Sequence, residues 1–281
     1  MAQKLNDLEK RIKAVEYLKK TGFLINYNNL ELYHGRAKMP NEKNWFVKSD
    51  VDNSHNTTRD NIMGVPCLCV ASFDIAESYA KGASLGGRSG NMEIHEIVSL
   101  DNDALIVNEK FKLGKLSQNE LIKFYAAIRS LSKGSVKNYC KNIKNADLVL
   151  NEIKSSFGYD SIISMGDELV IFDNLNKQGV NVSEKSIEKI VGAINAYNWF
   201  NNMPVMAVSD YVFLQGEKRE VFTSGGYLYR QDLGLIRQIF DNNNIIALKK
   251  KSFSAEKDHI VYVFNLSKVQ TAEVVQREEK E

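Results

Sequence analysis

The chain has 281 residues, which is long enough to bury a core in one large domain or in two ordinary ones. Its 37 Lys and Arg residues nearly balance 35 Asp and Glu residues, and the net charge of +2 gives no general attraction to nucleic acid or to an anionic membrane. A run of about eighteen apolar residues is absent, which excludes a membrane-spanning helix. The three cysteines are an odd number and include a C-L-C pair too tight for a normal metal knuckle, so buried reduced thiols are the simplest interpretation.

The first segment of the chain has the pattern of an amphipathic helix. Its apolar residues recur at helical spacing between Lys, Glu and Arg: Leu5, Leu8, Ile12, Val15 and Leu18. This charged start does not resemble an apolar export signal. We therefore expect the protein to be cytoplasmic where it folds, and to reach any host cell through a specialised secretion system.

Two short strands are predicted next, in FLINYNNLELYHG (residues 23–35), because Asn28 and Asn29 interrupt an otherwise apolar and aromatic run. The segment 40–66 is rich in Asn, Asp, Ser and Thr and has no sustained period, so we expect a long loop there. Long ordered loops carry function more often than the elements they connect.

A strand followed at once by a helix is predicted in CLCVAS (67–72) and FDIAESYAKG (73–82). The glycine-rich stretch 85–91 lacks the G-K-[ST] ending of a phosphate-binding loop, which argues against a nucleoside triphosphatase. Residues 92–100 predict another strand. In this strand two sets of residues alternate between the faces: Met92, Ile94 and Glu96 on one, and Glu93, His95 and Ile97 on the other.

Residues 117–156 are predicted to be helical, because Ser117 and Glu120 fit a capping box ahead of an apolar stripe. A strand is predicted again over 158–174, where LVIF forms a continuous β-branched and aromatic run. The polar segment NLNKQGVNVSEK follows, and we expect the domain boundary there.

Three of these pieces occur in an order found in a known superfamily. LYHGR (32–36) closes the first pair of strands, VASFDIAESYA (70–80) joins a strand to a helix, and GYDSIISMGDELVIFDN (158–174) brings an acidic residue just ahead of an apolar run. The chain thereby resembles the ADP-ribosyltransferase superfamily, whose signature is His-Tyr-Glu in one branch and Arg-Ser-Glu in the other. The resemblance covers roughly residues 30–175, and its last piece is the most specific.

The resemblance implies that Glu168 is the catalytic carboxylate. Breaking the nicotinamide–ribose bond of NAD builds positive charge on the ribose, and a carboxylate beside it stabilises that oxocarbenium-like state. The resemblance also implies that His34 contacts the adenosine ribose and that the backbone of Gly35 contacts the nicotinamide carboxamide. Tyr79 matches the aromatic residue that stacks on the nicotinamide ring, with Phe73 as its competitor.

Two further residues are candidate contacts for NAD. Ser72 falls where the Arg-Ser-Glu branch keeps its serine, so the middle motif fits both branches. Arg36 is close enough in sequence to reach the pyrophosphate, which we infer from its chemistry and not from a family rule. His55 and His95 are most simply a loop residue and a strand residue. No His or Cys spacing supports a metal site, so no metal is expected. The resemblance implies that NAD is a substrate.

One departure from the family pattern concerns the acceptor. The arginine-specific branch carries Glu or Gln two positions before the catalytic Glu, and here that position is Gly166. Either the acceptor is not arginine or another group positions it, for example Asp167 or Glu96. Plain structural roles also stay open for three of the candidates: a solvated turn acid for Glu168, helix-to-sheet packing for Tyr79 and a surface charge for Arg36.

We therefore expect an α+β fold with a split β-sheet core of the ADP-ribosyltransferase type, a helical N-terminus, and a helical insertion at about 101–157. A catalytic domain would span 1–176, and a smaller C-terminal α/β module, for accessory or target-recognition functions, would span 180–281. The alternative is one continuous domain, in which VFLQG (212–216) or HIVYVFNL (259–266) pairs with the catalytic sheet.

The expected function is mono-ADP-ribosyl transfer from NAD to a macromolecule by a bacterial effector or toxin. The acceptor is expected to be protein in preference to nucleic acid, with no insertion into a membrane. Two alternatives remain at this point: hydrolysis of NAD without an acceptor, and a catalytically inactive fold retained as a binding module. The sequence identifies neither the target nor the modified residue.

Overall fold

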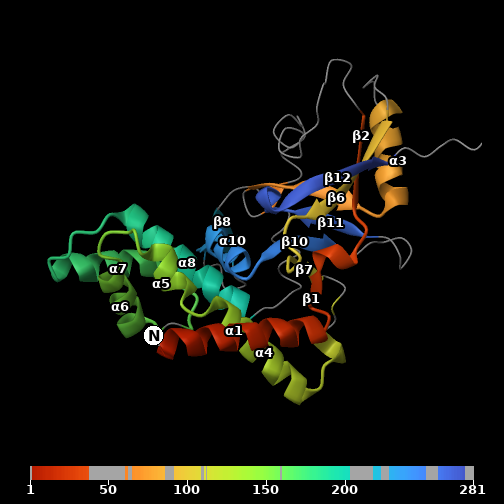
Figure 1. Cartoon of the computed structure of the whole chain (residues 1–281). Coiled ribbons are helices and arrows are strands. Elements are labelled where there is room, and N and C mark those ends of the chain that lie inside the picture. The colour runs from red at the N-terminus through yellow and green to blue at the C-terminus, as the bar shows by residue number, and fades with distance from the viewer. Residues whose placement is uncertain are drawn as a thin grey trace, which may run out of the picture. The chain divides into compact units, whose positions relative to one another are not determined.

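A computed structural model of the chain describes residues 2–37, 61–62, 65–85, 92–108, 111, 113–158, 160–202, 218–222, 228–250 and 259–275 (Figure 1). The chain divides into two units, and each is assembled from separated segments. The sheet unit comprises Leu18–Lys115 and Asn244–Glu281, and the helical unit comprises Met1–Tyr17 and Leu116–Asn243. The fold is therefore α+β, as expected.

An eight-stranded sheet, in the order β1-β7-β10-β11-β5-β2-β6-β12, forms the sheet unit. Neighbouring strands are antiparallel except β7 and β10, which are parallel. The strands are β1 (Leu24–Asn26), β2 (Tyr33–Ala37), β5 (Leu68–Ala71), β6 (Met92–Ser99), β7 (Leu105–Asn108), β10 (Ile245–Lys250), β11 (Ile260–Val263) and β12 (Val269–Val275). Shorter elements of this unit are η1 (Tyr27–Asn29), the pair β3 (Asn61–Ile62) and β4 (Val65–Pro66), η2 (Leu113–Lys115) and η3 (Leu266–Lys268).

The C-terminal strands belong to the same sheet as the N-terminal ones. β10 and β11 lie between β7 and β5, and β12 extends the far edge beside β6. The division expected at residues 176–180 therefore differs from the observed one, because the proposed C-terminal module supplies three strands of the sheet. HIVYVFNL forms β11 and pairs with β5, as the one-domain alternative required for this segment. VFLQG lies outside the described residues.

One face of the sheet carries the apolar core of the sheet unit. Val70 of β5 pairs with Val261 of β11, and Leu68 pairs with Val263, so these four side chains share a face. Further residues of the same buried cluster are Tyr27, Leu32, Ile97, Ala104, Ile106, Ile246, Ala247 and Val269. These residues come from both segments of the unit, so neither segment alone contains the core.

Helix α3 (Phe73–Leu85) covers the opposite face and crosses β2 at a glycine (Figure 1). A Cβ atom on Gly35 would lie 2.6 Å from the carbonyl carbon of Ala76 and closer still to its oxygen. Ala76 and Ala80, one helical turn apart, are both buried. Close packing of α3 on β2 therefore requires glycine at residue 35.

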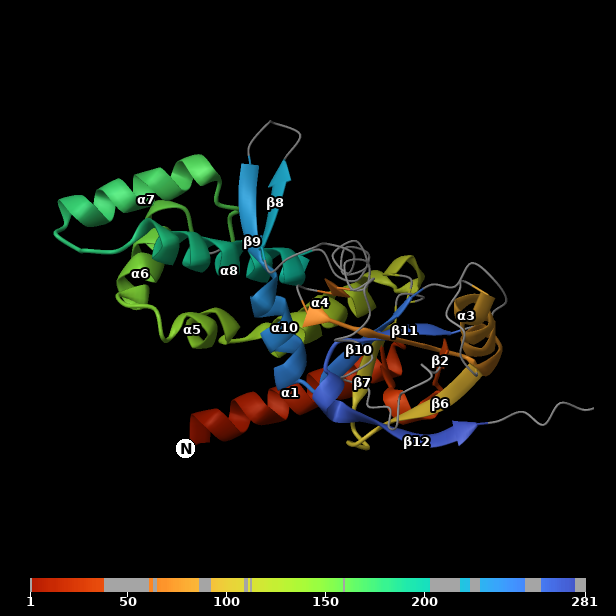
Figure 2. The same ribbon diagram turned by 90° about the horizontal axis from the view of Figure 1, so that it is seen from above.

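The helical unit is built around α8, which packs against α4, α5, α6, α7, α10 and β9 (Figure 2). Its elements are most of α1 (Ala2–Lys20), then α4 (Gln118–Ser132), α5 (Ser135–Cys140), α6 (Ala146–Ser156), α7 (Met165–Lys177), α8 (Glu184–Asn202), β8 (Lys218–Phe222), β9 (Leu228–Asp232) and α10 (Leu233–Asn242). β8 and β9 form a separate antiparallel hairpin. α8 is buried over most of its length, which is typical of a central helix.

The helices predicted at the N-terminus and from Ser117 are present, but α1 packs differently from the prediction, and residues 117–156 divide into α4, α5 and α6. α4 begins with the capping box of Ser117 and Glu120. α1 forms, but Leu8 and Ile12 of the expected stripe are 54% and 50% exposed, while Leu18 is buried. Periodicity thus located the helix but not the whole of its buried face.

The strand expected over 158–174 is wrong, because most of this segment is α7. Ser164 caps the helix in a reciprocal capping box with Asp167. Glu168, Ile171 and Leu175 follow at helical spacing and are buried. The four-residue apolar run LVIF was too short to distinguish a strand from a helix, and the capping box was the overlooked signal.

Candidate functional site

Four polar residues from two neighbouring strands lie on one face of the sheet. In the β2–β6 ladder His34 is directly opposite His95, and Arg36 is directly opposite Glu93. Residues two apart on a strand share a face, and so do residues directly opposite each other. We call His34, Arg36, Glu93 and His95 the β2–β6 cluster.

The β2–β6 cluster continues the face that carries the apolar core. Leu32 precedes His34 by two positions and Ile97 follows His95 by two, and both belong to the buried cluster described above. Arg36 is 7% exposed and His95 only 3%. Burying charged and polar groups beside an apolar core costs free energy unless specific interactions offset it. This arrangement therefore calls for an explanation beyond packing.

Within the cluster, the imidazole of His95 contacts the carboxylate of Glu93. Nε2 of His95 lies 3.1 Å from Oε2 of Glu93. Burial lowers the pKa of His95 below its usual 6.5; the contact with Glu93 opposes this shift and the positive charge of Arg36 reinforces it. His95 is then neutral near pH 7, and its Nε2–H donates to the carboxylate. Glu93 remains partly accessible, with 15% of its side chain exposed.

A backbone contact fixes the ring of His34. Its Nδ1 lies 2.8 Å from the carbonyl oxygen of Cys69 on the neighbouring strand β5. A carbonyl oxygen only accepts, so Nδ1 carries the hydrogen in this contact. In the neutral ring Nε2 is then an acceptor, which suits a hydroxyl group of a ligand.

A further cation, Lys249, lies on the same face. Lys249 of β10 is opposite Val261, and Val261 is opposite Val70, which shares the face of His34. The side chain of Lys249 is buried, at 6% exposure. With strands about 4.8 Å apart, the backbones at residues 249 and 34 are separated by roughly 14 Å. Arg36 and Lys249 thus bring two basic side chains to this face.

Ser72 stands at the junction of β5 and α3, where the backbone of His259 binds it. Its amide donates to the carbonyl oxygen of His259 at 3.0 Å. Its hydroxyl oxygen is buried and has no hydrogen-bond partner among the residues that the structure describes. A buried hydroxyl without a partner is costly, so Ser72 is a candidate contact for a polar ligand.

The two aromatic candidates lie on α3, on the side of the sheet opposite His34. Phe73 packs edge to face on Tyr33, with ring centroids 5.3 Å apart. Tyr79 is 56% exposed, so helix-to-sheet packing does not explain it. The structure therefore does not bring Tyr79 onto the face of the β2–β6 cluster, and its stacking on nicotinamide stays a prediction.

Glu168, the expected catalytic carboxylate, belongs to the helical unit, whereas His34 belongs to the sheet unit. Nη1 of Arg230 lies 2.9 Å from Oε2 of Glu168 and 2.9 Å from Oε1 of Glu188. This ion-pair network joins α7, β9 and α8. Glu168 thus has a local structural role within the helical unit. Its expected place ahead of a strand is wrong.

The two acceptor-positioning candidates are explained locally. Asp167 caps α7 through Ser164. Glu96 is opposite Tyr33 on the α3 side of the sheet, where it raises the pKa of the Tyr33 hydroxyl after the larger effects of burial and Glu31. Neither residue shares the face of His34.

Sequence reasoning missed three residues of this face: Glu93, His95 and Lys249. The alternation of residues 92–97 placed Glu93, His95 and Ile97 together, but it did not reveal which strand would face them. The sequence gives no indication that Lys249 is buried, because LKK (residues 248–250) resembles the exposed end of a strand. Cross-strand register, which the sequence does not encode locally, was the missing information.

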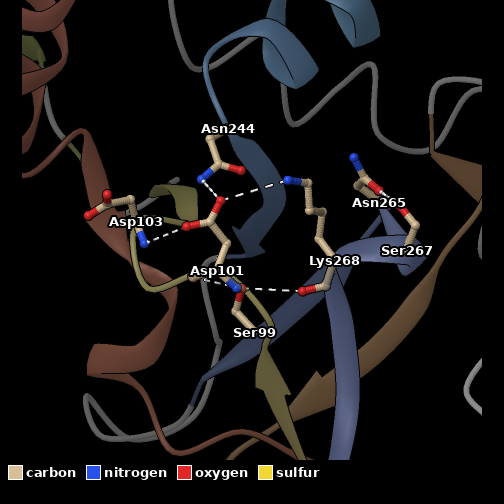
Figure 3. Close-up of polar contacts among 7 residues, drawn as sticks. All are labelled: Ser99, Asp101, Asp103, Asn244, Asn265, Ser267 and Lys268. Atoms are coloured by element: carbon tan, nitrogen blue, oxygen red, sulfur yellow. Dashed lines mark hydrogen bonds and ion pairs between the residues drawn. The ribbon is translucent and has the colours of Figure 1, made fainter.

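A second polar cluster of the sheet unit is structural (Figure 3). Asp101 accepts the backbone N–H of Asp103 at 3.0 Å and the side-chain amide of Asn244 at 2.8 Å, and Lys268 is 3.7 Å away. These contacts, led by the one from Asp103, hold the pKa of Asp101 below its usual value. The cluster lines a surface depression and ties the β6–β7 turn to the starts of β10 and β12.

No metal-binding arrangement is found among the described residues, where no three His, Cys, Asp or Glu side chains come together suitably. The described helices include none with the length and apolar character needed to cross a membrane.

No protein-family model matches the chain, and no curated protein or solved structure matches it either.

Proposed function

We propose that the chain is an ADP-ribosyltransferase that binds NAD on the face of the β2–β6 cluster. The observation that carries the proposal is the direct pairing of His34 with His95 and of Arg36 with Glu93 on a face that is otherwise apolar core. The sequence resemblance supports the same location, because the histidine that it matches to NAD binding, in LYHGR, lies on β2. The remaining candidate contact, Ser72, belongs to the same unit.

The chemistry of the cluster matches the parts of NAD. Nε2 of His34 accepts a hydrogen bond from a ribose hydroxyl, since Nδ1 is engaged with the backbone of Cys69. The guanidinium of Arg36 binds the pyrophosphate, because its planar donors fit two phosphate oxygens at once. Ser72 supplies a further hydroxyl. Each of these groups binds the ground state and the transition state alike.

Glu93 is the carboxylate that we assign to the reaction in place of Glu168. It shares the face of His34, one step diagonally across the β2–β6 ladder, about 7 Å between backbones. Its carboxylate contacts the ring of His95, and a carboxylate at this position would offset positive charge that develops on the ribose. Glu168, in contrast, is neutralised by Arg230 in the helical unit.

The test compares Glu93→Gln with Glu168→Gln in a nicotinamide-release assay with NAD. Removing a preorganised charge at the reacting sugar costs about 10²–10³ in turnover. We therefore expect Glu93→Gln to lose at least about 100-fold, while Glu168→Gln stays within about threefold of wild type once its folding is confirmed by circular dichroism. The opposite ranking would restore Glu168 and refute the assignment to Glu93.

Two further readouts separate this proposal from its alternatives. His34→Ala should raise the dissociation constant for NAD more than it lowers turnover, because His34 binds ribose in both states. Labelled NAD incubated with the full chain and a cell lysate should mark a macromolecule. Nicotinamide release with no labelled acceptor indicates hydrolysis, and failure to bind NAD in calorimetric titration indicates a binding module without this activity.

A further inference from the structure

The helical unit has a strongly uneven distribution of charge that the overall balance conceals. Residues 121–146, which span most of α4, α5 and the turn after it, contain no Asp or Glu. They contain six cations: Lys123, Arg129, Lys133, Lys137, Lys141 and Lys144. All six are exposed. We call these six residues the basic segment.

The residues that follow have the opposite charge. Residues 147–188 contain eight acidic residues and three cations, and therefore a net charge of 3 − 8 = −5. The basic segment has a net charge of +6, counted in the same way. Such an asymmetry between neighbouring parts of one unit is typical of a surface that binds a polyanion.

Ion pairs among the described residues leave most of the basic segment without an acidic partner. Lys133 contacts Asp7 at 2.6 Å and Lys137 contacts Asp147 at 3.4 Å. Both pairs are well exposed, with the Lys137–Asp147 side chains 78% and 75% accessible, so each contributes little free energy and is readily exchanged for another anion. Lys10 and Arg11 of α1 also act on Asp7, which extends the positive potential to that helix.

Three of the cations follow a helical spacing. Lys137, Lys141 and Lys144 occur at positions i, i+4 and i+7, and Lys141 keeps helical backbone angles after the end of α5. Two i→i−3 hydrogen bonds, Ile143 to Cys140 and Ala146 to Ile143, continue the turn. Lys137 lies in α5, and Lys141 and Lys144 lie in the turn that follows it. The three exposed lysines thus concentrate positive charge within eight consecutive residues.

We infer that the helical unit binds the phosphate backbone of a nucleic acid through the basic segment. Exposed Asn138 and Asn142 lie between the lysines, and amide side chains commonly donate to phosphate oxygens. An anionic membrane surface fits less well, because Cys140 is buried and Val136 half-buried, which leaves α5 without an apolar face to insert. Nucleic acid, and not the protein acceptor expected from the resemblance, is then the macromolecule that this unit holds.

The test measures binding of the full chain to a short fluorescein-labelled DNA, duplex and single-stranded, by anisotropy over a range of salt concentrations and without NAD. The variant is Lys137→Gln, Lys141→Gln and Lys144→Gln together. The matched control replaces three exposed lysines of the acidic part of the same unit: Lys154→Gln, Lys177→Gln and Lys185→Gln. Both triples remove the same charge from exposed positions, and thermal melting checks that both fold.

We expect the wild type to bind with a steep salt dependence. Each lost phosphate contact lowers the slope of log K against log salt by about 0.7–0.9, so the variant should lose about 2–3 in slope and at least tenfold in affinity. The control should stay within about twofold of wild type. Equal losses of DNA affinity in the two triple variants, or no DNA binding by the wild type, would overturn the inference.

Two further measurements distinguish this inference from a membrane-binding surface and from transfer of ADP-ribose to the bound DNA. Binding to vesicles with anionic lipids, and not to DNA, would replace nucleic acid with a membrane surface and overturn the inference. DNA that binds through the basic segment but is never labelled from NAD leaves this inference standing and counts against the proposed transfer to it. Binding is measured without NAD, so failure of the proposed function does not affect this result.

Discussion

Gly35 offers the most direct test of the fold around the candidate site. The sequence resemblance assigned its backbone to the nicotinamide carboxamide, whereas the structure shows that α3 packs onto it. In the variant Gly35→Ala, the new Cβ would lie 2.6 Å from the carbonyl carbon of Ala76 and 3.2 Å from its Cα. Backbone atoms cannot rotate away, so the helix or the strand must move.

The size of the effect follows from these distances. Non-bonded carbon atoms are favourable at about 3.5–4.0 Å, so α3 must shift by roughly 1 Å or more. A shift of that size weakens the packing of buried Ala76 and Ala80 on β2. Overpacking of a core by one methyl group typically costs about 1–3 kcal/mol, and the backbone clash puts Gly35→Ala at the upper end, about 2–3 kcal/mol.

Urea unfolding followed by far-ultraviolet circular dichroism measures this loss, and hydrogen exchange in residues 73–85 locates it. Gly114→Ala is the matched control in the same unit, since no described residue other than its chain neighbours has an atom within 4 Å of the added Cβ. This change should alter the free energy of unfolding by less than about 0.5 kcal/mol. If Gly35→Ala unfolds like this control but binds NAD weakly, the glycine serves the ligand and our packing argument is wrong.

Two other predictions concern the helical unit and the division of the chain. Glu152 accepts hydrogen bonds from the side chains of Asn174, Gln178 and Ser156, which hold its pKa below the usual value near 4.5. A carboxyl group whose pKa is lower in the folded than in the unfolded state stabilises the protein above pH about 4.5, and this stabilisation is lost as the pH falls through the folded-state pKa. The free energy of unfolding should therefore fall more steeply on acidification in wild type than in Glu152→Gln. Parallel urea-unfolding profiles of the two proteins from pH 7 to 3 would contradict this. A fragment ending at Asn176 lacks β10, β11 and β12 and exposes the unpaired edges of β5 and β7, so we expect it to aggregate and to bind no NAD. If size-exclusion chromatography shows a soluble fragment and calorimetry shows that it binds NAD, the sheet tolerates the loss of these three strands.

Local patterns in the sequence correctly predicted several elements. Ser117 and Glu120 marked the start of α4 because a capping box involves residues only three positions apart. CLCVAS and FDIAESYAKG predicted β5 followed by α3 for a similar reason, since β-branched residues and helical spacing are local properties. The α+β class and the position of His34 on a strand were also available from the sequence alone.

Local patterns failed where two structures compete over a short segment. LVIF is compatible with a buried strand, but in α7 only Ile171 of this run is buried, while Leu169 and Val170 are exposed. The buried face of α7 includes Glu168 because Arg230 offsets its charge. The identity of Arg230 as its partner depends on packing between α7 and β9. That packing could not be deduced from the segment itself.

The sequence by itself thus determined most of the local elements and the polar residue types present on β2 and β6. Only the tertiary structure decided that β10 and β11 insert between β7 and β5, that His34 faces His95, and that Lys249 shares their face. The physical reason is that strand register depends on pairing between residues far apart in the chain, and a shift of one residue would move every side chain to the other face. Periodicity reports which residues alternate on one strand, and only the neighbouring strands determine what they meet.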